Sequence, residues 1–446
     1  MNISIDQFNK YSIKCAKFIK NYKLIDKKFY QNKFKIIDKI FQIILKSDVL
    51  FNLEIKENNI NISNEDLLII NFLKEILQRN KLQNFFEKNG LQHFDKISFA
   101  LENNNNKFVL LWYFNNKYLI HDNYEWKKYL SRKIGDSSLL NLLHNNPFVS
   151  IEFELMIGSK NLKKLIIKKD NIFINIFSES SSNININKIM HICKFMLDLS
   201  HNKNQVINLN IFFSNIKKEF HFGMKNKSLG PSNINSGSTL SGSYINIWRS
   251  EELDKVLIHE LIHYLNFDFK YNSKGCEIIE DYITKFNING EIKLNEAFTE
   301  TLALIIHSIY LSYKISKSIN YFDNIINYEI NFSLFQCYKI LNYFDININN
   351  FFINNSKTII QTTDVFSYFI IKTFIILSLD QFLKFIDKDI YFNERYLEFI
   401  ELVNNSLNEK NNFMKLIEKF NKIYINKKNF IWKTLRMTCL QLNSFE

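Results

Sequence analysis

The sequence predicts an α+β protein in which helical regions flank a central region of short strands. Apolar residues recur at three and four positions over residues 29–45 and 67–86, which is the period of a helix with one buried face. The same helical pattern covers residues 294–311 and about 318–440, and segments typical of strands lie between the two helical regions. At 446 residues the chain is long enough for two or three domains, or for one catalytic domain with large helical additions.

The strands are expected in order along the central region. β-Branched and aromatic residues dominate each of them, and polar residues suited to turns separate the paired ones. One helix, over residues 186–199, interrupts the series. The expected strands are a hairpin over 107–120, a second pair over 163–169 and 172–177, and single strands over 206–213 and 243–248.

A cluster of glycines marks the segment before the last of these strands. Four of the nine glycines and one of the two prolines lie between residues 223 and 242. In a chain so poor in both residues, the cluster predicts a loop whose backbone turns tightly or is approached closely. Ser250 follows the strand over 243–248, and we expect its hydroxyl to cap the next helix, whose first residues are acidic.

Composition and charge argue against several classes of protein. The net charge of +12 can attract nucleic acid, but lysine shares in a general bias towards Asn, Ile, Lys and Phe that is typical of an AT-rich genome. No basic block or RNA-binding motif is present, so nucleic-acid binding is not expected. The five cysteines are odd in number and form no CxxC pair, which argues against a disulfide framework and for a reducing compartment.

No segment is predicted to enter a membrane. The N-terminus lacks the apolar core of a signal peptide. The most apolar stretch, Val365 to Leu379, is short and contains Lys372, so it predicts a buried helix rather than a membrane span. We therefore expect a protein without membrane insertion, inside the cell.

The motif His259-Glu260-Leu-Ile-His263 carries the strongest chemical signal. Residues four apart share one face of a helix, so both imidazoles can bind one metal ion. Glu260 lies beside that face, where its carboxylate can take a proton from a metal-bound water. The neighbours from Val256 to Leu265 are uncharged outside the motif, as a buried active-site helix requires.

A third metal ligand is expected further along the chain. The segment Leu294 to Glu300 predicts a helix with Glu296 and Glu300 on one face, surrounded by apolar residues. Unpaired carboxylates would be costly there, which favours a metal-binding role over a solvated helix face. Glu296 is the preferred third ligand, and Glu300, Glu277 and Glu280 are the alternatives.

These motifs resemble those of the gluzincin zinc peptidases, in which a glutamate lies in a run Asn-Glu-x-x-(Ser/Thr)-(Asp/Glu) on a second helix. The resemblance implies a zincin-like catalytic domain with one Zn²⁺ per chain, bound by His259, His263 and Glu296. It further implies that Glu300 holds the far ring nitrogen of His259 and that Asn295 holds that of His263.

A closer resemblance covers about residues 160–312. The segments 212–218, 229–237 and 247–252, together with the motif helix, are similar to the metallopeptidase family of nucleocytoplasmic large DNA viruses. The AT-rich composition suits such a virus or an entomopoxvirus, and implies a location in the host cytoplasm or the virion. The expected organisation is a mainly helical region over 1–150, the peptidase core over 151–312 and a helical region over 313–446.

The activity implied by the resemblance is hydrolysis of a peptide bond in a polypeptide substrate, with Glu260 as the general base. The strand over 243–248 is expected to be the sheet edge that pairs with an extended substrate. A further donor should stabilise the oxyanion, and Tyr368, Tyr310 and His307 are candidates, although Tyr368 is better interpreted as an aromatic residue of a buried helix.

Two other functions remain open from the sequence. One is a virion or interaction protein that keeps the zincin fold as a scaffold and has little catalytic turnover. The other, supported only by the charge, is nucleic-acid binding. The intact Glu260 favours the enzyme, because a scaffold needs the metal ligands but not the base.

Overall fold

The computed structural model has an α+β fold with a mixed sheet and many helices, as the sequence predicts. The chain divides into two compact units. The first unit comprises Met1–Glu54, Ile167–Ile174 and Ser182–Glu446, and the second comprises Ile55–Ile166 and Asn175–Ser181. The structure describes residues 7–30, 34–59, 71, 74, 94–103, 109, 163–178, 184–220, 228–269, 286–348, 351–352, 357–392, 395–423 and 429–443.

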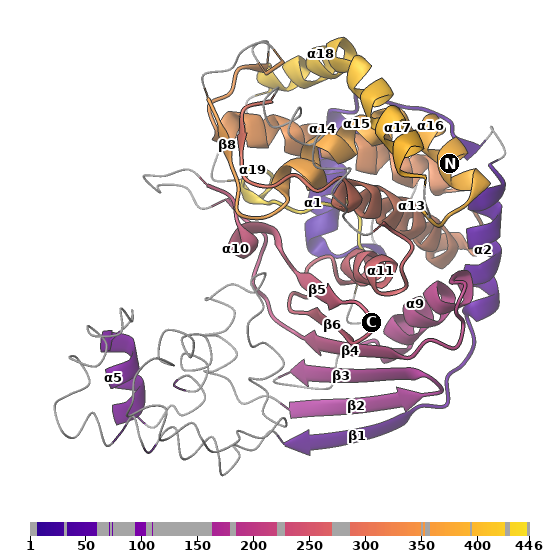
Figure 1. Ribbon diagram of the computed structural model, residues 1–446, viewed down its shortest axis with the longest axis vertical. Helices are drawn as coiled ribbons and strands as arrows, with labels where there is room; N and C mark the ends of the chain where they lie inside the picture. Colours follow the sequence, from indigo (N-terminus) through magenta and orange to yellow (C-terminus); the bar gives the residue numbers. More distant parts are fainter. Residues whose placement is uncertain are drawn as a thin grey trace. The chain divides into compact units, whose positions relative to one another are not determined.

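The first unit holds most of the described elements (Figure 1). Its helices are α1 (Lys10–Asn21), α2 (Lys35–Ser47), α9 (Ile186–Leu199), α10 (Pro231–Ile234), α11 (Leu253–Tyr264), α13 (Leu294–Ser316), α14 (Phe322–Tyr343), the π-helix η5 (Phe366–Ile371), α15 (Lys372–Leu377), α16 (Leu379–Lys388), α17 (Tyr396–Asn408), α18 (Lys410–Asn421) and α19 (Phe430–Lys433). Its strands are β4 (Ile207–Phe212), β5 (Gly237–Leu240), β6 (Tyr244–Ile247), β7 (Ile288–Asn289) and β8 (Ile359–Ile360).

The second unit contains most of β1 (Glu54–Asn59) and the helix α5 (Phe94–Glu102), and β2 (Lys163–Lys169) and β3 (Ile172–Ser178) have residues in both units. Within the second unit, Lys163 Nζ lies 2.6 Å from Glu57 Oε1. The hairpin expected over 107–120 and the helix expected over 67–86 lie outside the described residues, apart from single positions.

The sheet of the first unit has the strand order β2, β3, β4, β6, β5. β4 runs parallel to β6, with Ile211 opposite Ile247, and β5 runs antiparallel to β6, with Thr239 opposite Ile245. Among the described strands, β5 therefore has a neighbour on one side only. α11 packs on β5 and β6 and beside α9, and α13 packs on α11 (Figure 1).

Local patterns explain the helices that position the site. α2 is amphipathic, since its buried residues, including Ile36, Ile40 and Ile44, recur at the helical period. The side chain of Asn185 caps α9 by accepting from the backbone N–H of Lys188. α11 is instead buried on every side, and only His263 of its twelve residues is more than slightly exposed.

Two expectations about the segment before α11 are wrong. The described part of residues 223–242 is not one loop, because α10 and β5 form within it. The tight turn and the close approach predicted there are confirmed, since Gly242, at φ 75°, makes the turn from β5 to β6 and Gly237 lies against Glu260. Ser250 does not cap α11: its hydroxyl donates to the carbonyl of Ser214. The cap position is Glu252, in the left-handed conformation at φ 62°.

The C-terminal helical region packs in the same unit as the predicted core, so the three consecutive regions expected from the sequence do not correspond to the two compact units.

The stretch Val365 to Leu379 is buried, as predicted, and begins as the π-helix η5. The short strand β8 lies in a part of the chain where only helices were expected. None of the described helices is both long enough and apolar enough to cross a membrane.

Paired charges are buried around the start of α11. Lys218 Nζ lies 2.8 Å from Glu252 Oε2, and both side chains are almost inaccessible to solvent. The other carboxylate oxygen of Glu252 accepts from the backbone N–H groups of Met437 and Thr438, which ties the C-terminal segment to the helix. Burial disfavours the charged form of Glu252, but Lys218 and Arg436 outweigh it and hold its pKa below the usual range.

Glu252→Gln should destabilise the fold strongly. The substitution leaves Lys218 buried without a counter-charge, which typically costs about 3–5 kcal/mol of unfolding free energy. Urea denaturation of the two proteins measures this difference. As a control, Asp26→Asn removes the partner of Lys23 from an exposed pair and should change stability by less than about 1 kcal/mol. Equal effects of the two substitutions would contradict the role assigned to Glu252.

Candidate metal centre

Two packed helices bring the predicted ligand residues together. α11 presents His259 and His263 one turn apart on the same face. The first turn of α13 presents Glu296 towards them, because α13 packs along α11 with its apolar residues buried. Among the described residues, these three form the group whose side chains can jointly hold a metal ion.

The three candidate ligand atoms form a nearly equilateral triangle. His259 Nε2 lies 3.2 Å from His263 Nε2. Glu296 Oε2 lies 3.3 Å from His263 Nε2 and 3.5 Å from His259 Nε2. With zinc–ligand bonds of about 2.0–2.1 Å and tetrahedral angles, neighbouring ligand atoms are about 3.3–3.4 Å apart. The triangle therefore has the dimensions of one face of a tetrahedral zinc site.

The environment of Glu296 also fits a cation. Its Oε2 atom is buried and has no hydrogen-bond partner among the described residues. Burial favours the protonated carboxyl, but the nearby His263 and His259 rings outweigh it and hold the pKa of Glu296 well below the usual range. A buried carboxylate oxygen without a donor, next to two imidazole nitrogens, is a donor set that zinc prefers.

The outer ring nitrogens of both histidines face carboxylates. His259 Nδ1 lies 3.1 Å from Glu300 Oε2, where the sequence analysis placed Glu300. His263 Nδ1 lies 2.7 Å from Asp268 Oδ2. A carboxylate at the outer nitrogen keeps the proton there and leaves Nε2 free to bind a metal.

Asp268 thus occupies the position expected for Asn295, so the prediction that Asn295 holds the outer ring nitrogen of His263 is wrong. The Oδ1 atom of Asn295 is buried and has no hydrogen-bond partner among the described residues. Asn266, in the left-handed conformation at φ 56°, reverses the chain just after α11 and brings Asp268 back onto the His263 ring. An acidic residue four positions after the last residue of the helix was the signal in the sequence.

The alternative third ligands differ in where they lie. Glu300 faces the Nδ1 side of His259 rather than the Nε2 triangle, and it also pairs with Lys255. Glu277 and Glu280 lie outside the described residues.

Glu260 is held beside the triangle by the edge strand. The hydroxyl of Thr239 donates to Glu260 Oε2 at 2.7 Å. Glu260 is 6% exposed, and burial raises the pKa of its carboxyl above the usual range, although His259 and His263 oppose this. β5 approaches so closely that a Cβ atom at Gly237 would come within 2.6 Å of Glu260 Oε1.

The sheet edge is β5, not the strand expected over 243–248. That strand, β6, lies between β4 and β5. The expectation was wrong because β5 belongs to the glycine-rich segment, where glycine and serine give little strand signal.

Of the three candidates for the oxyanion donor, Tyr368 is near the triangle. Its ring centroid lies 6.0 Å from that of His259, and it lines the same cavity as His259 and Glu260. Tyr310 packs instead on His191 and Phe195. His307 is buried, and neither of its ring nitrogens has a partner among the described residues. Burial lowers the pKa of His307 to about 3.

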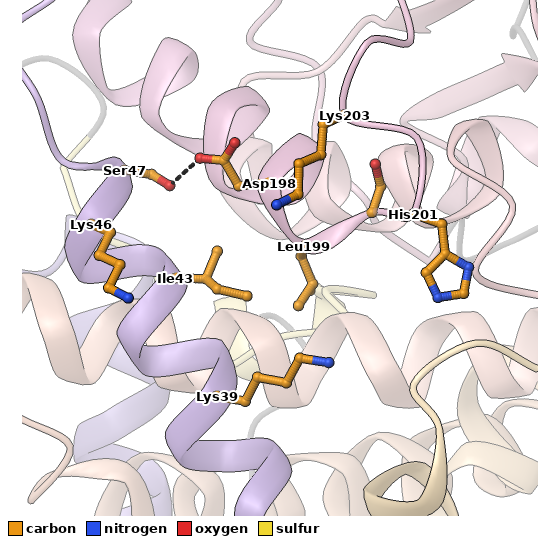
Figure 2. A pocket seen from close by; sticks show the side chains of 9 residues that line it. Lys39, Ile43, Lys46, Ser47, Asp198, Leu199, His201 and Lys203 are labelled. Carbon is orange, nitrogen blue, oxygen red and sulfur yellow. Dashed lines mark hydrogen bonds between the residues drawn. The ribbon is translucent and has the colours of Figure 1, made fainter.

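A larger hollow of about 510 Å³ lies between α2 and the end of α9 (Figure 2). Lys39, Lys46 and Lys203 line it, and Ser47 donates to Asp198 at its rim. His201 also lines it and stacks on Tyr391. The described residues of this hollow provide no group of metal ligands.

The remaining histidines fit structural roles where they are described. His191 Nε2 lies 2.9 Å from the carbonyl of Ile44. His93, His121, His144 and His221, which have no metal-binding spacing in the sequence, lie outside the described residues.

Comparisons with known proteins give distant similarities. No protein-family profile and no solved structure matches the chain. It is 23% identical over 347 residues to the uncharacterized protein R210 of Acanthamoeba polyphaga mimivirus, covering 63% of this chain and 87% of that protein. It is 26% identical over 379 residues to protein Ycf2 of Physcomitrium patens, covering 77% of this chain but only 16% of the length of Ycf2.

Asp268→Ala should weaken zinc binding by about 10- to 100-fold, because it removes the carboxylate that orients His263. Asn295→Ala, the matched control on α13, should leave the affinity unchanged. Competition with a zinc chelator measures both. If Asn295→Ala weakened binding as much as Asp268→Ala, the outer partner of His263 would have to be reassigned.

Proposed function

We propose that the chain is a zinc-dependent peptidase of the gluzincin type, with a zincin-like core in the first unit. The observation that carries the proposal is the triangle of His259 Nε2, His263 Nε2 and Glu296 Oε2, with edges of 3.2, 3.3 and 3.5 Å. These atoms fit one zinc ion per chain with a fourth position left for a water or a substrate oxygen. A structural zinc site would instead use four protein ligands.

When bound, zinc would supply an acidified water and polarise the scissile carbonyl. Glu260 follows His259 directly and is the carboxylate suited to take the proton and later deliver it to the leaving amine. Its burial favours this role, because burial raises the pKa of the Glu260 carboxyl towards the range of a base that works at neutral pH. Thr239 holds one oxygen of Glu260 and leaves the other for the proton transfer.

A polypeptide substrate would pair with β5. Among the described strands β5 has β6 on one side only, so its other edge can take an extended chain by backbone hydrogen bonds. The contact between Thr239 and Glu260 places this edge next to the general base. Tyr368, beside His259, is the residue best placed to donate to the oxyanion.

A viral origin fits this proposal. The match to the mimivirus protein covers 87% of the length of that protein, and the AT-rich composition also fits a viral genome. A viral enzyme of this kind would act in the host cytoplasm or in the virion.

Purified protein should contain one zinc per chain, and His263→Ala or Glu296→Ala should remove it, since two ligands do not hold a catalytic zinc stably. Elemental analysis by mass spectrometry measures the content. His201→Ala, outside the centre, should keep the full content. The metal assignment fails if zinc is present equally in His263→Ala and in the unaltered protein.

Glu260→Gln should retain zinc and lose peptidase activity by a factor of about 10² to 10⁴, because the amide keeps the shape but cannot accept the proton. Digestion of a peptide library followed by mass spectrometry gives both the rate and the cleavage preference. The His263→Ala protein, prepared identically, reports any contaminating protease. Unchanged cleavage by Glu260→Gln, above that background, would mean that another residue is the base.

A further inference from the structure

Two lysines are buried against the carboxylate that orients His259. Lys255 lies on α11, one turn before His259, and its Nζ donates to Glu300 Oε2, the same oxygen that faces His259 Nδ1. Lys372, the first residue of α15, has its Nζ 3.9 Å from Glu300 Oε1. All three charged side chains are 2% exposed or less.

The carboxylate that orients His263 has no such partner among the described residues. Asp268 is 11% exposed, and no lysine or arginine of the described part of the chain lies within ion-pair distance of it. The two imidazoles therefore face unequal environments. Among the described residues, the carboxylate at the outer nitrogen of His263 has no cationic partner, whereas the carboxylate at the outer nitrogen of His259 is shared with two ammonium groups.

This asymmetry has a chemical consequence at the metal. A carboxylate at Nδ1 increases the electron donation of an imidazole to its metal, and a cation on that carboxylate reduces the donation. Buried charges act strongly on one another because water does not screen them. Lys255 and Lys372 should therefore weaken the electrostatic attraction for a divalent cation and keep a bound one electrophilic.

We propose that Lys255, assisted by Lys372, is a positioning residue that acts through Glu300 to limit the zinc affinity of the centre. This inference rests on the proposed zinc site and adds a residue that the ligand motif does not contain. Lys255 neutralises part of the charge of Glu300, and the same Glu300 oxygen faces the ring of His259. The zinc affinity then reflects a balance of buried charges rather than the ligand set alone.

The test is zinc affinity, measured by competition with a fluorescent chelator at neutral pH. Lys255→Met removes the charge and keeps most of the side-chain volume, so zinc should bind about 10-fold more tightly or better. Glu300→Gln should bind zinc about 10- to 100-fold more weakly. The double variant removes both charges, so its zinc affinity should lie between those of the two single variants, because the two effects have opposite signs.

A purely structural role for Lys255 gives a different pattern. Loss of packing would weaken zinc binding in Lys255→Met and weaken it further in the double variant, which would overturn the proposal. The visible absorption of the cobalt-substituted proteins reports the ligand geometry, and it should be the same in Lys255→Met as in the original protein. Lys339→Met is the matched control, because Lys339 is equally buried but donates to the carbonyls of Ile431 and Thr434.

A second substitution keeps the proposal testable if Lys255→Met does not fold. Lys372→Met should also tighten zinc binding, by about threefold, because Lys372 is further from Glu300. Unchanged or weaker binding in a folded Lys372→Met protein would overturn the proposal in that case. If the original protein binds no zinc, the proposed function fails. If it binds zinc but neither methionine variant binds more tightly, only the present inference fails.

Discussion

The burial of α11, from which only His263 is partly exposed, is the constraint on which the rest of the first unit depends. A helix without a solvent-facing side must find a partner inside the protein for every charge that it carries, because an unpaired buried charge costs several kcal/mol. Asp254 pairs with Lys188 of α9, Lys255 with Glu300 of α13, and Glu260 with Thr239 of β5. Each of these pairs fixes a neighbouring element against the helix, and the candidate metal centre lies where α13 and β5 meet it.

The same requirement draws the C-terminal segment into the unit. Glu252, at the start of α11, accepts from the backbone of Met437 and Thr438, and Glu329 of α14 accepts from the backbone of Cys439 and Leu440. Burial raises the pKa of Glu329 to about 7, so its environment is costly for a charge, and these donors offset part of the cost. The C-terminal helices are therefore part of the support of α11, which is why a division at residue 312 does not separate compact units.

The sequence predicted what depends on local pattern. The helix that carries His259 and His263, the helix of Glu296 and the strands β2, β3 and β4 follow from periodicity over a few residues. The sequence could not predict contacts that depend on the geometry of a turn. Asp268 reaches His263 only because one left-handed residue after α11 reverses the chain, whereas Oδ1 of Asn295, the residue expected there from the gluzincin motif, has no hydrogen-bond partner among the described residues. The edge strand was missed because its residues have weak strand propensity.

The weak propensity of β5 has a physical reason in the site itself. The backbone of β5 comes almost into contact with the carboxylate of Glu260. At Gly237 there is no room for a side chain, since a Cβ atom would lie 2.6–2.9 Å from three atoms of the Glu260 side chain. Thr239, two residues on and on the same face of the strand, can then reach Glu260 with its hydroxyl. The cluster of glycines that predicts a loop in the sequence thus includes β5, where the close contact with Glu260 requires small residues. A strand of large β-branched residues would have been easy to predict and could not have approached Glu260.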